Sequence, residues 1–239
     1  MKLSVIIPVY NEDNTIGELI DRVARVDIGN MEMEIIVAND GSTDASALII
    51  EAHRQAQPDL IRAYATPINL GKGAAIRLGL HYATGDVILI QDADLELDPN
   101  EYGRLLQPIL DGKNDVVYGS RFMNTRQHGI PLRTRLANRF LTALTNLLYN
   151  ARLSDMATAY KVFRRELLRD IRLRCVRFDF DPEITGQFLR AGCRIVEVPI
   201  SYNPRSAEEG KKISWIDGIE AIYTLLRVRF HPSPERQRF

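Results

Sequence analysis

Two aspartates that are one residue apart, Asp92 and Asp94, come directly after the apolar run 87–91. Carboxylates with this spacing just beyond a strand can both turn toward one cation. A hard divalent ion such as Mg²⁺ or Mn²⁺ takes one or two protein carboxylates and completes its shell with water and phosphate oxygens. Glu96 repeats the spacing and is a candidate third ligand. The alternative is a solvated acidic turn, because Asp-x-Asp also occurs by chance in acidic loops.

Two further polar segments follow apolar runs and could face a ligand. Asp40 lies in Asn-Asp-Gly-Ser after residues 34–38, where a carboxylate could accept a hydrogen bond from a nucleobase. Lys72 lies between two glycines before a helical segment, which resembles a phosphate-facing loop without the full P-loop spacing. Each segment taken alone could be an ordinary turn, since Asn, Asp and Gly are turn residues.

The elements that must position these residues alternate between two hydrophobic periods. Nearly continuous apolar runs predict strands over 3–9, 34–38, 61–65, 87–91 and 115–119, with helices between them over 16–23, 42–57, 72–83 and 99–110. This alternation predicts βαβ units and a mostly parallel sheet flanked by helices, an α/β fold whose ligands bind at the carboxyl ends of the strands. The less regular second half predicts helices over 133–149, 181–191 and 214–230, strands over 159–163 and 194–199, and a flexible tail over 231–239.

The charge of the chain is balanced overall but divided between its halves. The 239 residues contain 31 basic and 31 acidic side chains, which argues against a nucleic-acid binder driven by bulk charge. Residues 1–120 carry a net charge of −10 and residues 121–239 a net charge of +10. Such an asymmetry suggests that the halves meet different ligands, although scattered solvated charge would give the same totals.

The remaining bulk properties indicate a globular protein. The chain is 45% hydrophobic and 26% charged, and its two cysteines are too few for a disulfide framework. The first apolar run is too short for a signal sequence, and no stretch reaches the roughly 18 apolar residues of a membrane span. We therefore expect a cytoplasmic location.

Five segments in a fixed order carry a resemblance to a known family. They are Pro-Val-Tyr-Asn-Glu at 8–12, Asn-Asp-Gly-Ser at 39–42, Asn-Leu-Gly-Lys-Gly at 69–73, Asp-Ala-Asp at 92–94 and Tyr-Gly-Ser-Arg at 118–121. The chain resembles inverting family 2 glycosyltransferases of the GT-A fold, and most of all the dolichyl-phosphate mannose synthase group of polyprenyl-phosphate glycosyltransferases. The resemblance implies one GT-A domain over 1–230, with a nucleotide-sugar half over 1–121 and an acceptor half, a C-terminal extension, over 122–230.

The resemblance also implies roles for individual residues. It assigns the nucleotide sugar to Pro8, Tyr10, Glu12, Asp40, Lys72, Asp92 and Ala93, the Mg²⁺ or Mn²⁺ ion to Asp92, Asp94 and Glu96, and catalysis to Asp94, Arg121 and Asp155. Mannose synthases usually have Gln where this chain has Glu96. They also carry an Asp…Thr-Ser-Gly-Phe-Arg stretch where this chain has residues 155–161, which lack the Ser-Gly pair. These differences leave the donor open among GDP-mannose, UDP-glucose and UDP-GlcNAc.

The acceptor decides which residues the reaction needs. A lipid phosphate is largely ionised at neutral pH and needs cations to position it. The candidates are Arg121, Arg133, Arg135, Arg139, Arg205, Lys211 and Lys212, the last three in a basic loop that the resemblance places over the phosphates. A hydroxyl of a glycan or cell-envelope polymer would instead need a base, with Asp155, Asp181 and Glu183 as candidates. A third alternative is a protein that binds a nucleotide sugar without turnover.

A polyprenyl phosphate lies in a membrane, so we also considered peripheral contact or delivery by a membrane partner. The amphipathic segments 133–149 and 214–230 could lie on the bilayer surface, with Trp215 at the interface and Arg227 and Arg229 near anionic lipid. The alternative is that both apolar faces pack into the core.

Overall fold

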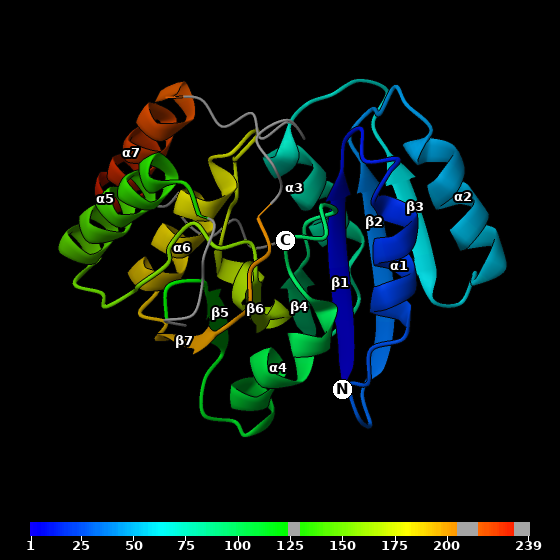
Figure 1. Cartoon of the computed structure of the whole chain (residues 1–239). Helices are drawn as coiled ribbons and strands as arrows, with labels where there is room; N and C mark the ends of the chain where they lie inside the picture. Colours follow the sequence, from blue (N-terminus) through cyan, green and yellow to red (C-terminus); the bar gives the residue numbers. More distant parts are fainter. Residues whose placement is uncertain (124–129, 205–214, 232–239) are drawn as a thin grey trace.

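The structure is a computed structural model that describes residues 1–123, 130–204 and 215–231. The protein is built on one seven-stranded sheet (Figure 1). The strand order is β3-β2-β1-β4-β6-β5-β7. All neighbouring strands are parallel except β6, which runs antiparallel to β4 and to β5. The predicted mostly parallel sheet is therefore confirmed. The strands are β1 (Lys2–Val9), β2 (Glu32–Asn39), β3 (Ile61–Ala65), β4 (Val87–Ile90), β5 (Val116–Ser120), β6 (Lys161–Arg164) and β7 (Ile195–Pro199).

Helices cover both faces of the sheet. On one face are α1 (Ile16–Ala24), α2 (Ser46–Ala56) and α4 (Tyr102–Leu110), which a short 3₁₀ turn, Pro99–Glu101, precedes. On the other are α3 (Lys72–Tyr82) and α6 (Phe180–Arg190), and a 3₁₀ segment, Arg165–Asp170, follows β6. The last two helices, α5 (Leu132–Tyr149) and α7 (Trp215–Phe230), pack on each other and on α6 at the β7 end of the sheet (Figure 1).

The apolar runs of the sequence are strands buried on both faces. Along β1, Leu3, Val5 and Ile7 face the core beneath α1 and α4, whereas Ile6 faces the core beneath α3. All four side chains have no exposed surface. Since every second position meets a different core, the strand needs an uninterrupted apolar run, as parallel sheets generally do.

Helix α5 buries polar residues and exposes large apolar ones, while Leu141, Leu144 and Leu148 pack, partly buried, against a small core cluster. Its fully or nearly buried residues are polar: Asn138, Thr142 and Thr145. Its outward side carries Leu132, Leu136, Phe140 and Leu147, which are 55–81% exposed. On α7, Ala221, Leu225 and Val228 are buried, but Trp215, Ile216, Ile219, Tyr223 and Phe230 are 54–76% exposed. The alternative of core packing therefore holds for Leu144 on α5 and for Leu225 and Val228 on α7, and it is wrong for the exposed residues of both helices. No helix in the described part of the chain is long and apolar enough to cross a membrane.

A buried carboxylate on β2 makes the stability of the fold sensitive to acid. Glu34 accepts hydrogen bonds from Ser4 Oγ at 2.5 Å and from the Thr84 amide at 2.7 Å, and Lys2 Nζ lies 2.8 Å away. Burial alone would raise the pKa of Glu34, but these partners outweigh it and lower the pKa to about 2. Because the pKa is depressed in the folded state, its stabilisation of about 3 kcal/mol is present above the unfolded pKa of about 4.3 and is lost as the pH falls toward 2.

We expect Glu34→Gln to remove most of this acid sensitivity. Urea unfolding measured near pH 7 and near pH 3 should show a smaller fall in the free energy of unfolding for the variant than for the wild type. Glu32→Gln, an exposed change on the same strand, is the matched control and should keep the wild-type dependence. Equal pH dependence in wild type and Glu34→Gln would contradict the assignment.

Candidate active site

The segments predicted to face a ligand lie at one edge of the sheet. Because β1, β2, β4 and β5 run in the same direction, their carboxyl ends share this edge. Hydrogen bonds join neighbouring loops there, as from the Asn11 amide to Ser42 Oγ at 3.1 Å. The predicted residues at or following the ends of these strands are Pro8, Tyr10, Glu12, Asp40, Asp92, Ala93, Asp94, Glu96 and Arg121, and Lys72 begins α3 beside them.

Asp40 organises the loop that leads to α3. Its side chain is almost fully buried, and its oxygens accept hydrogen bonds from the amides of Leu70 at 2.9 Å and Gly71 at 2.6 Å. The next residue must be glycine: Gly41 has φ +66°, and a Cβ there would meet the carbonyl carbon of Ile68 at 2.4 Å. Asp40 thus positions this loop in the structure, and its contact with a nucleotide stays a prediction.

Gly71 and Gly73, the glycines beside Lys72, leave room for the backbone of residues 176–177. This corrects the expectation that their loop faces a phosphate. The first amides of α3 already have acceptors: Gly73 N donates to Arg177 O at 2.8 Å and Ala74 N to Val176 O at 2.9 Å. A Cβ on Gly71 would lie 2.6 Å from Val176 O, and one on Gly73 would lie 2.9 Å from Arg177 O. The amides of Gly73 and Ala74 are therefore bonded within the chain, and the side chain of Lys72 is the cation that this segment offers a phosphate.

Lys72 forms an ion pair with the first aspartate of the acidic pair. Its Nζ lies 2.6 Å from Asp92 Oδ1 and donates to Oδ2 at 2.7 Å. Burial opposes a charge on Lys72, but the carboxylates of Asp92 and Asp181 outweigh it and raise the pKa of Lys72. Lys72 is therefore held as a cation beside the acidic loop, where it can meet an anionic group.

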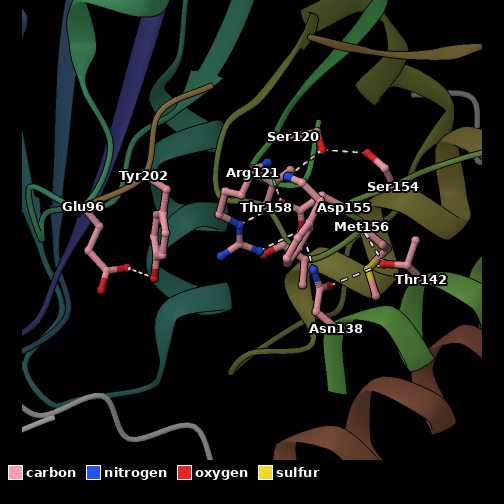
Figure 2. Close-up of polar contacts among 12 residues, drawn as sticks. Glu96, Ser120, Arg121, Asn138, Thr142, Ser154, Asp155, Met156, Thr158 and Tyr202 are labelled. Carbon is pink, nitrogen blue, oxygen red and sulfur yellow. Dashed lines mark hydrogen bonds and ion pairs between the residues drawn. The ribbon is translucent and has the colours of Figure 1, made fainter. Parts of the chain in front are cut away.

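The loop after β4 turns sharply and aims its carboxylates in different directions. Leu95 adopts φ +57°, and Asp94 Oδ1 accepts from the Glu96 amide at 3.2 Å. Glu96 is 7% exposed, and its Oε2 accepts from Tyr202 Oη at 2.8 Å (Figure 2). Asp92 is meanwhile turned toward Lys72.

This donor set suits a hard divalent cation in chemistry. Carboxylate oxygens are the ligands that Mg²⁺ and Mn²⁺ prefer. Among the described residues, however, no three acidic, histidine or cysteine side chains are grouped closely enough to hold a metal ion. Asp92 and Asp94 are the residues that would hold a cation here. In this structure Lys72 donates to Asp92, and Tyr202 donates to Glu96.

Behind this loop, Gln91 holds the backbone of the first aspartate. Gln91 is fully buried and its Nε2 donates to Asp92 O at 3.0 Å. Its Oε1 accepts from the hydroxyls of Tyr102 at 2.9 Å and Tyr160 at 2.8 Å. Three buried polar side chains, from the residue after β4, the first residue of α4 and the residue before β6, thus satisfy one another and brace the acidic loop.

Arg121 at the end of β5 is locked onto Asp155. Its Nε and Nη2 donate to the two oxygens of Asp155, both at 2.8 Å, and Nη2 also donates to Ala157 O at 2.9 Å (Figure 2). Asn138 Nδ2 adds a hydrogen bond of 2.8 Å to Asp155 Oδ1. Burial disfavours the charge on Arg121, but Asp155 outweighs it and raises the pKa of Arg121. Asp155 has no exposed surface and orients Arg121.

The other two carboxylates considered as bases are also engaged. Asp181 Oδ1 lies 2.6 Å from Nζ of Lys161, a fully buried lysine on β6. Glu183 is 1% exposed; its Oε2 accepts from the Cys175 amide at 2.6 Å and its Oε1 from Arg227 Nη2 at 2.7 Å. Glu183 therefore ties α7 and the segment before α6 to the core.

A cavity of about 530 Å³ lies between the end of β5 and helix α5. Its polar lining includes Arg121, Arg135, Arg139, Asn146 and Ser154. Arg135 Nε is buried and has no hydrogen-bond partner among the described residues, so it is a donor without an acceptor. Arg133, also predicted to bind acceptor phosphate, is exposed and does not line the cavity. Outside the described residues lie Arg205, Lys211, Lys212 and all but the first residue of the predicted tail over 231–239.

Two residues of this network were not predicted from the sequence. Asn138 supports Asp155, and Tyr202 joins Glu96 to Arg121. Asn138 carried a signal, because it is a polar residue among leucines on a helix. Tyr202 follows β7 in an irregular segment and carried none. Glu197, which belongs to a segment that matches the family's C-terminal pattern, accepts from the Asp155 amide at 2.8 Å.

Solved structures share this arrangement of the sheet. Two crystal structures of glucosyl-3-phosphoglycerate synthase from Mycobacterium tuberculosis match with TM-scores of 0.71 and 0.72 at 23% identity, covering 97% of this chain and 81% and 80% of theirs. Both hold Mn²⁺ and uridine diphosphate, and a third structure of that enzyme holds Mg²⁺. The likeness confirms the GT-A type of α/β fold.

The chain belongs to glycosyl transferase family 2, whose model matches residues 4–172. An undecaprenyl-phosphate 4-deoxy-4-formamido-L-arabinose transferase of Klebsiella pneumoniae is 32% identical over 228 residues, which are 94% of this chain and 66% of that protein. The glycosyltransferase AglD of Haloferax volcanii is 29% identical over 214 residues, 86% of this chain and 34% of that protein. This chain thus spans about two-thirds of the bacterial relative and about a third of the archaeal one. The resemblance to polyprenyl-phosphate glycosyltransferases is confirmed.

Proposed function

We propose that this protein transfers a hexose from a nucleotide sugar to a polyprenyl phosphate, with inversion and with a divalent cation held by Asp92 and Asp94. The observation that carries the phosphate acceptor is the cavity beside β5, whose lining includes Arg121, Arg139 and Arg135. The Nε of Arg135 has no hydrogen-bond partner in the part of the chain that the structure describes. Arginine suits this task because its planar fork binds phosphate oxygens in pairs. The relatives named as undecaprenyl-phosphate transferases support the same acceptor.

The chain's own residues divide the work along the sheet edge. The cation on Asp92 and Asp94 would supply charge neutralisation for the departing nucleoside diphosphate. Lys72 adds a fixed positive charge beside the same aspartate. Arg121, oriented by Asp155, holds the acceptor phosphate so that its oxygen attacks the anomeric carbon from the face opposite the leaving group. The bond to the nucleoside diphosphate breaks as the new bond forms, and the ionised phosphate has no proton to lose.

The burial and hydrogen bonds of the three candidate bases support a phosphate acceptor over a hydroxyl acceptor. A hydroxyl needs a carboxylate that can take its proton. Asp155 and Glu183 are fully or almost fully buried and accept several hydrogen bonds each, and Asp181 is paired with Lys161. Each would have to leave these partners to act as a base.

The test is transfer of a labelled sugar to a short, detergent-soluble polyprenyl phosphate, after a thermal-shift panel of UDP, GDP, CDP and dTDP sugars with Mn²⁺ has identified the donor. Arg139→Gln should raise KM for this acceptor by about 10-fold, since a charge-assisted hydrogen bond contributes about 1.5–3 kcal/mol. Arg133→Gln is the matched comparison on the same helix and should have a smaller effect, because Arg133 does not line the cavity. Transfer to a sugar hydroxyl but not to the lipid phosphate would contradict the proposal.

The exposed stripes of α5 and α7 rest on a membrane in this proposal, at its cytoplasmic face. Both helices expose large apolar side chains, among them Phe140 and Trp215, which a water-facing surface does not need. Arg133 on α5 and Arg229 on α7 supply positive charge for anionic lipid. Because the proposed acceptor is a lipid, the cavity beside α5 should lie close to the bilayer.

We expect the protein to float with phosphatidylglycerol vesicles at low salt. Trp215→Glu combined with Ile219→Glu should weaken this binding at least about 100-fold, since burying each apolar side chain contributes about 1.5–3 kcal/mol. Leu48→Glu, which changes an exposed leucine on α2 at the other end of the sheet, is the control and should bind as the wild type does. Vesicle binding that the double variant leaves unchanged would rule out this surface.

A further inference from the structure

A buried lysine and a partly exposed aspartate form an ion pair at the sheet edge that holds the candidate site. Lys161 is the first residue of β6, and because β6 runs antiparallel to β4 and β5, it lies at the edge where those strands end. Its Nζ lies 2.6 Å from Oδ1 of Asp181, the second residue of α6. The lysine side chain has no exposed surface, whereas that of Asp181 is 20% exposed. The pair is therefore open to solvent only on its anionic side.

The lysine of this pair supports the turn that Arg121 contacts. Lys161 Nζ donates to Met156 O at 3.2 Å and also to Thr158 O. The carbonyl oxygen of Ala157, between these two residues, accepts from Arg121 Nη2 at 2.9 Å. Lys161 thus fixes the backbone against which the guanidinium of Arg121 rests.

The chain that leads into α6 packs against the start of α3. Asp179 Oδ1 accepts hydrogen bonds from the amides of Val176 and Arg177, both at 2.9 Å. The carbonyl oxygens of the same two residues accept from amides in the first turn of α3, which Lys72 begins. The start of α6 is thus tied to the first turn of α3 as well as to the turn that Arg121 contacts.

The charge of Asp181 acts on the cations on both sides of it. Burial disfavours the charge on Lys72, but the carboxylates of Asp92 and then Asp181 outweigh it and raise the pKa of Lys72. Burial also disfavours the charge on Arg121, but Asp155 outweighs it, and Asp181 adds to the raised pKa of Arg121. Asp181 therefore lies within electrostatic reach of both cations.

We propose that Asp181 binds a hydroxyl group of the transferred hexose through Oδ2. The inference rests on the proposed function, because it takes the leaving diphosphate to lie by Lys72 and the acceptor phosphate by Arg121. Attack from the face opposite the leaving group requires these two groups to lie on opposite sides of the anomeric carbon, so the hexose lies between them. Asp181 lies in the same interval and offers its exposed side to it.

The second oxygen of Asp181 is available for this contact. Oδ1 is taken by Lys161, and among the described residues no hydrogen-bond donor reaches Oδ2. A carboxylate only accepts hydrogen bonds, and a sugar hydroxyl can donate one. Asp181 can accept this bond while it keeps its ion pair, whereas acting as a base would weaken the pair. A site that accepts from a substrate hydroxyl also rejects analogues that lack it.

The experiment measures donor affinity by isothermal titration calorimetry, with Mn²⁺ and without acceptor. The probes are UDP-glucose, UDP-GlcNAc and GDP-mannose and, for the donor that binds, analogues that each lack one hydroxyl of the hexose. In the wild type one analogue should bind about 10–100-fold more weakly than the complete donor, as loss of a charge-assisted hydrogen bond predicts. In Asp181→Ala the complete donor should lose about the same factor, and the two Kd values should agree within about twofold. UDP or GDP alone, which has no hexose, should bind this variant as it binds the wild type.

Two further variants show that the loss is specific to the hexose. Asp181→Ala leaves the buried charge of Lys161 without its partner, so adding Lys161→Met removes that charge and should restore stability. The double variant should still bind the complete donor and the analogue equally. Asp115→Ala, which breaks an ion pair with Arg164 at the opposite edge of the sheet, is the matched control and should keep the wild-type ratio of Kd values.

An Asp181→Ala variant that distinguishes the donors as the wild type does would overturn the inference. So would a wild type that binds every analogue as well as the complete donor. A wild type that binds none of these donors would overturn the proposed donor class, and the inference with it. Transfer to a sugar hydroxyl in place of the polyprenyl phosphate, with the discrimination intact, would overturn the proposed acceptor and leave Asp181 assigned to the hexose.

Discussion

Asp155→Asn is expected to lower the free energy of unfolding by about 3–5 kcal/mol, the usual effect of leaving one buried charge without its partner. Asp155 has no exposed surface, and its carboxylate accepts two guanidinium hydrogen bonds from Arg121 and one from Asn138. An asparagine of the same shape keeps the packing but leaves the Arg121 charge uncompensated. Transfer should also fall about 100-fold, because Arg121 would no longer be held in one orientation.

Combining Asp155→Asn with Arg121→Gln separates stability from function. The double variant carries no buried charge at this position, so most of the lost stability should return while transfer stays low. Urea unfolding and the transfer assay measure the two effects. Asp111→Asn, a change in a surface ion pair with Lys113, is the control and should alter stability by less than about 0.5 kcal/mol. An Asp155→Asn variant as stable as the wild type would show that the ion pair adds little.

The strands and helices were predictable because their signals are local. The strand over 61–65 was predicted with the bounds of β3, and the helix over 72–83 differs from α3 by one residue. The direction of β6 was not predictable, because periodicity records burial and not the direction of a strand. Nor did the sequence reveal that α5 buries two polar residues: Asn138 and Thr142 bond to Asp155 and to the Met156 amide.

The residues of the candidate site also fall into those that the sequence predicted and those that it did not. Residues that follow strand ends, such as Asp92 and Arg121, were found because topology places them at one edge. Lys72 was found for a partly wrong reason, since the glycines beside it make room for residues 176–177 and not for a phosphate. Tyr202 was missed because it reaches Glu96 across 106 positions of sequence, and no local pattern records such a contact.

The acidic loop makes the second large prediction, which concerns activity and not stability. Asp94→Asn should reduce transfer at least about 1,000-fold, since a bound cation contributes several kcal/mol of charge stabilisation and each 1.36 kcal/mol is a factor of ten in rate. Asparagine keeps the size of the side chain and an oxygen for the Glu96 amide, so the fold should remain intact. Addition of EDTA to the wild type should produce a similar loss, restored by excess Mn²⁺.

Asp98→Asn is the matched control for this loop. It makes the same change of charge four residues away, where the Asp98 carboxylate caps the turn before α4 by accepting from the Asn100 amide at 3.0 Å. Asparagine caps helices about as well as aspartate does, so Asp98→Asn should keep transfer within about twofold of the wild type. If both variants lose activity equally, the acidic loop acts through its summed charge and Asp94 has no particular role. If neither does, the transfer proceeds without a cation on this loop.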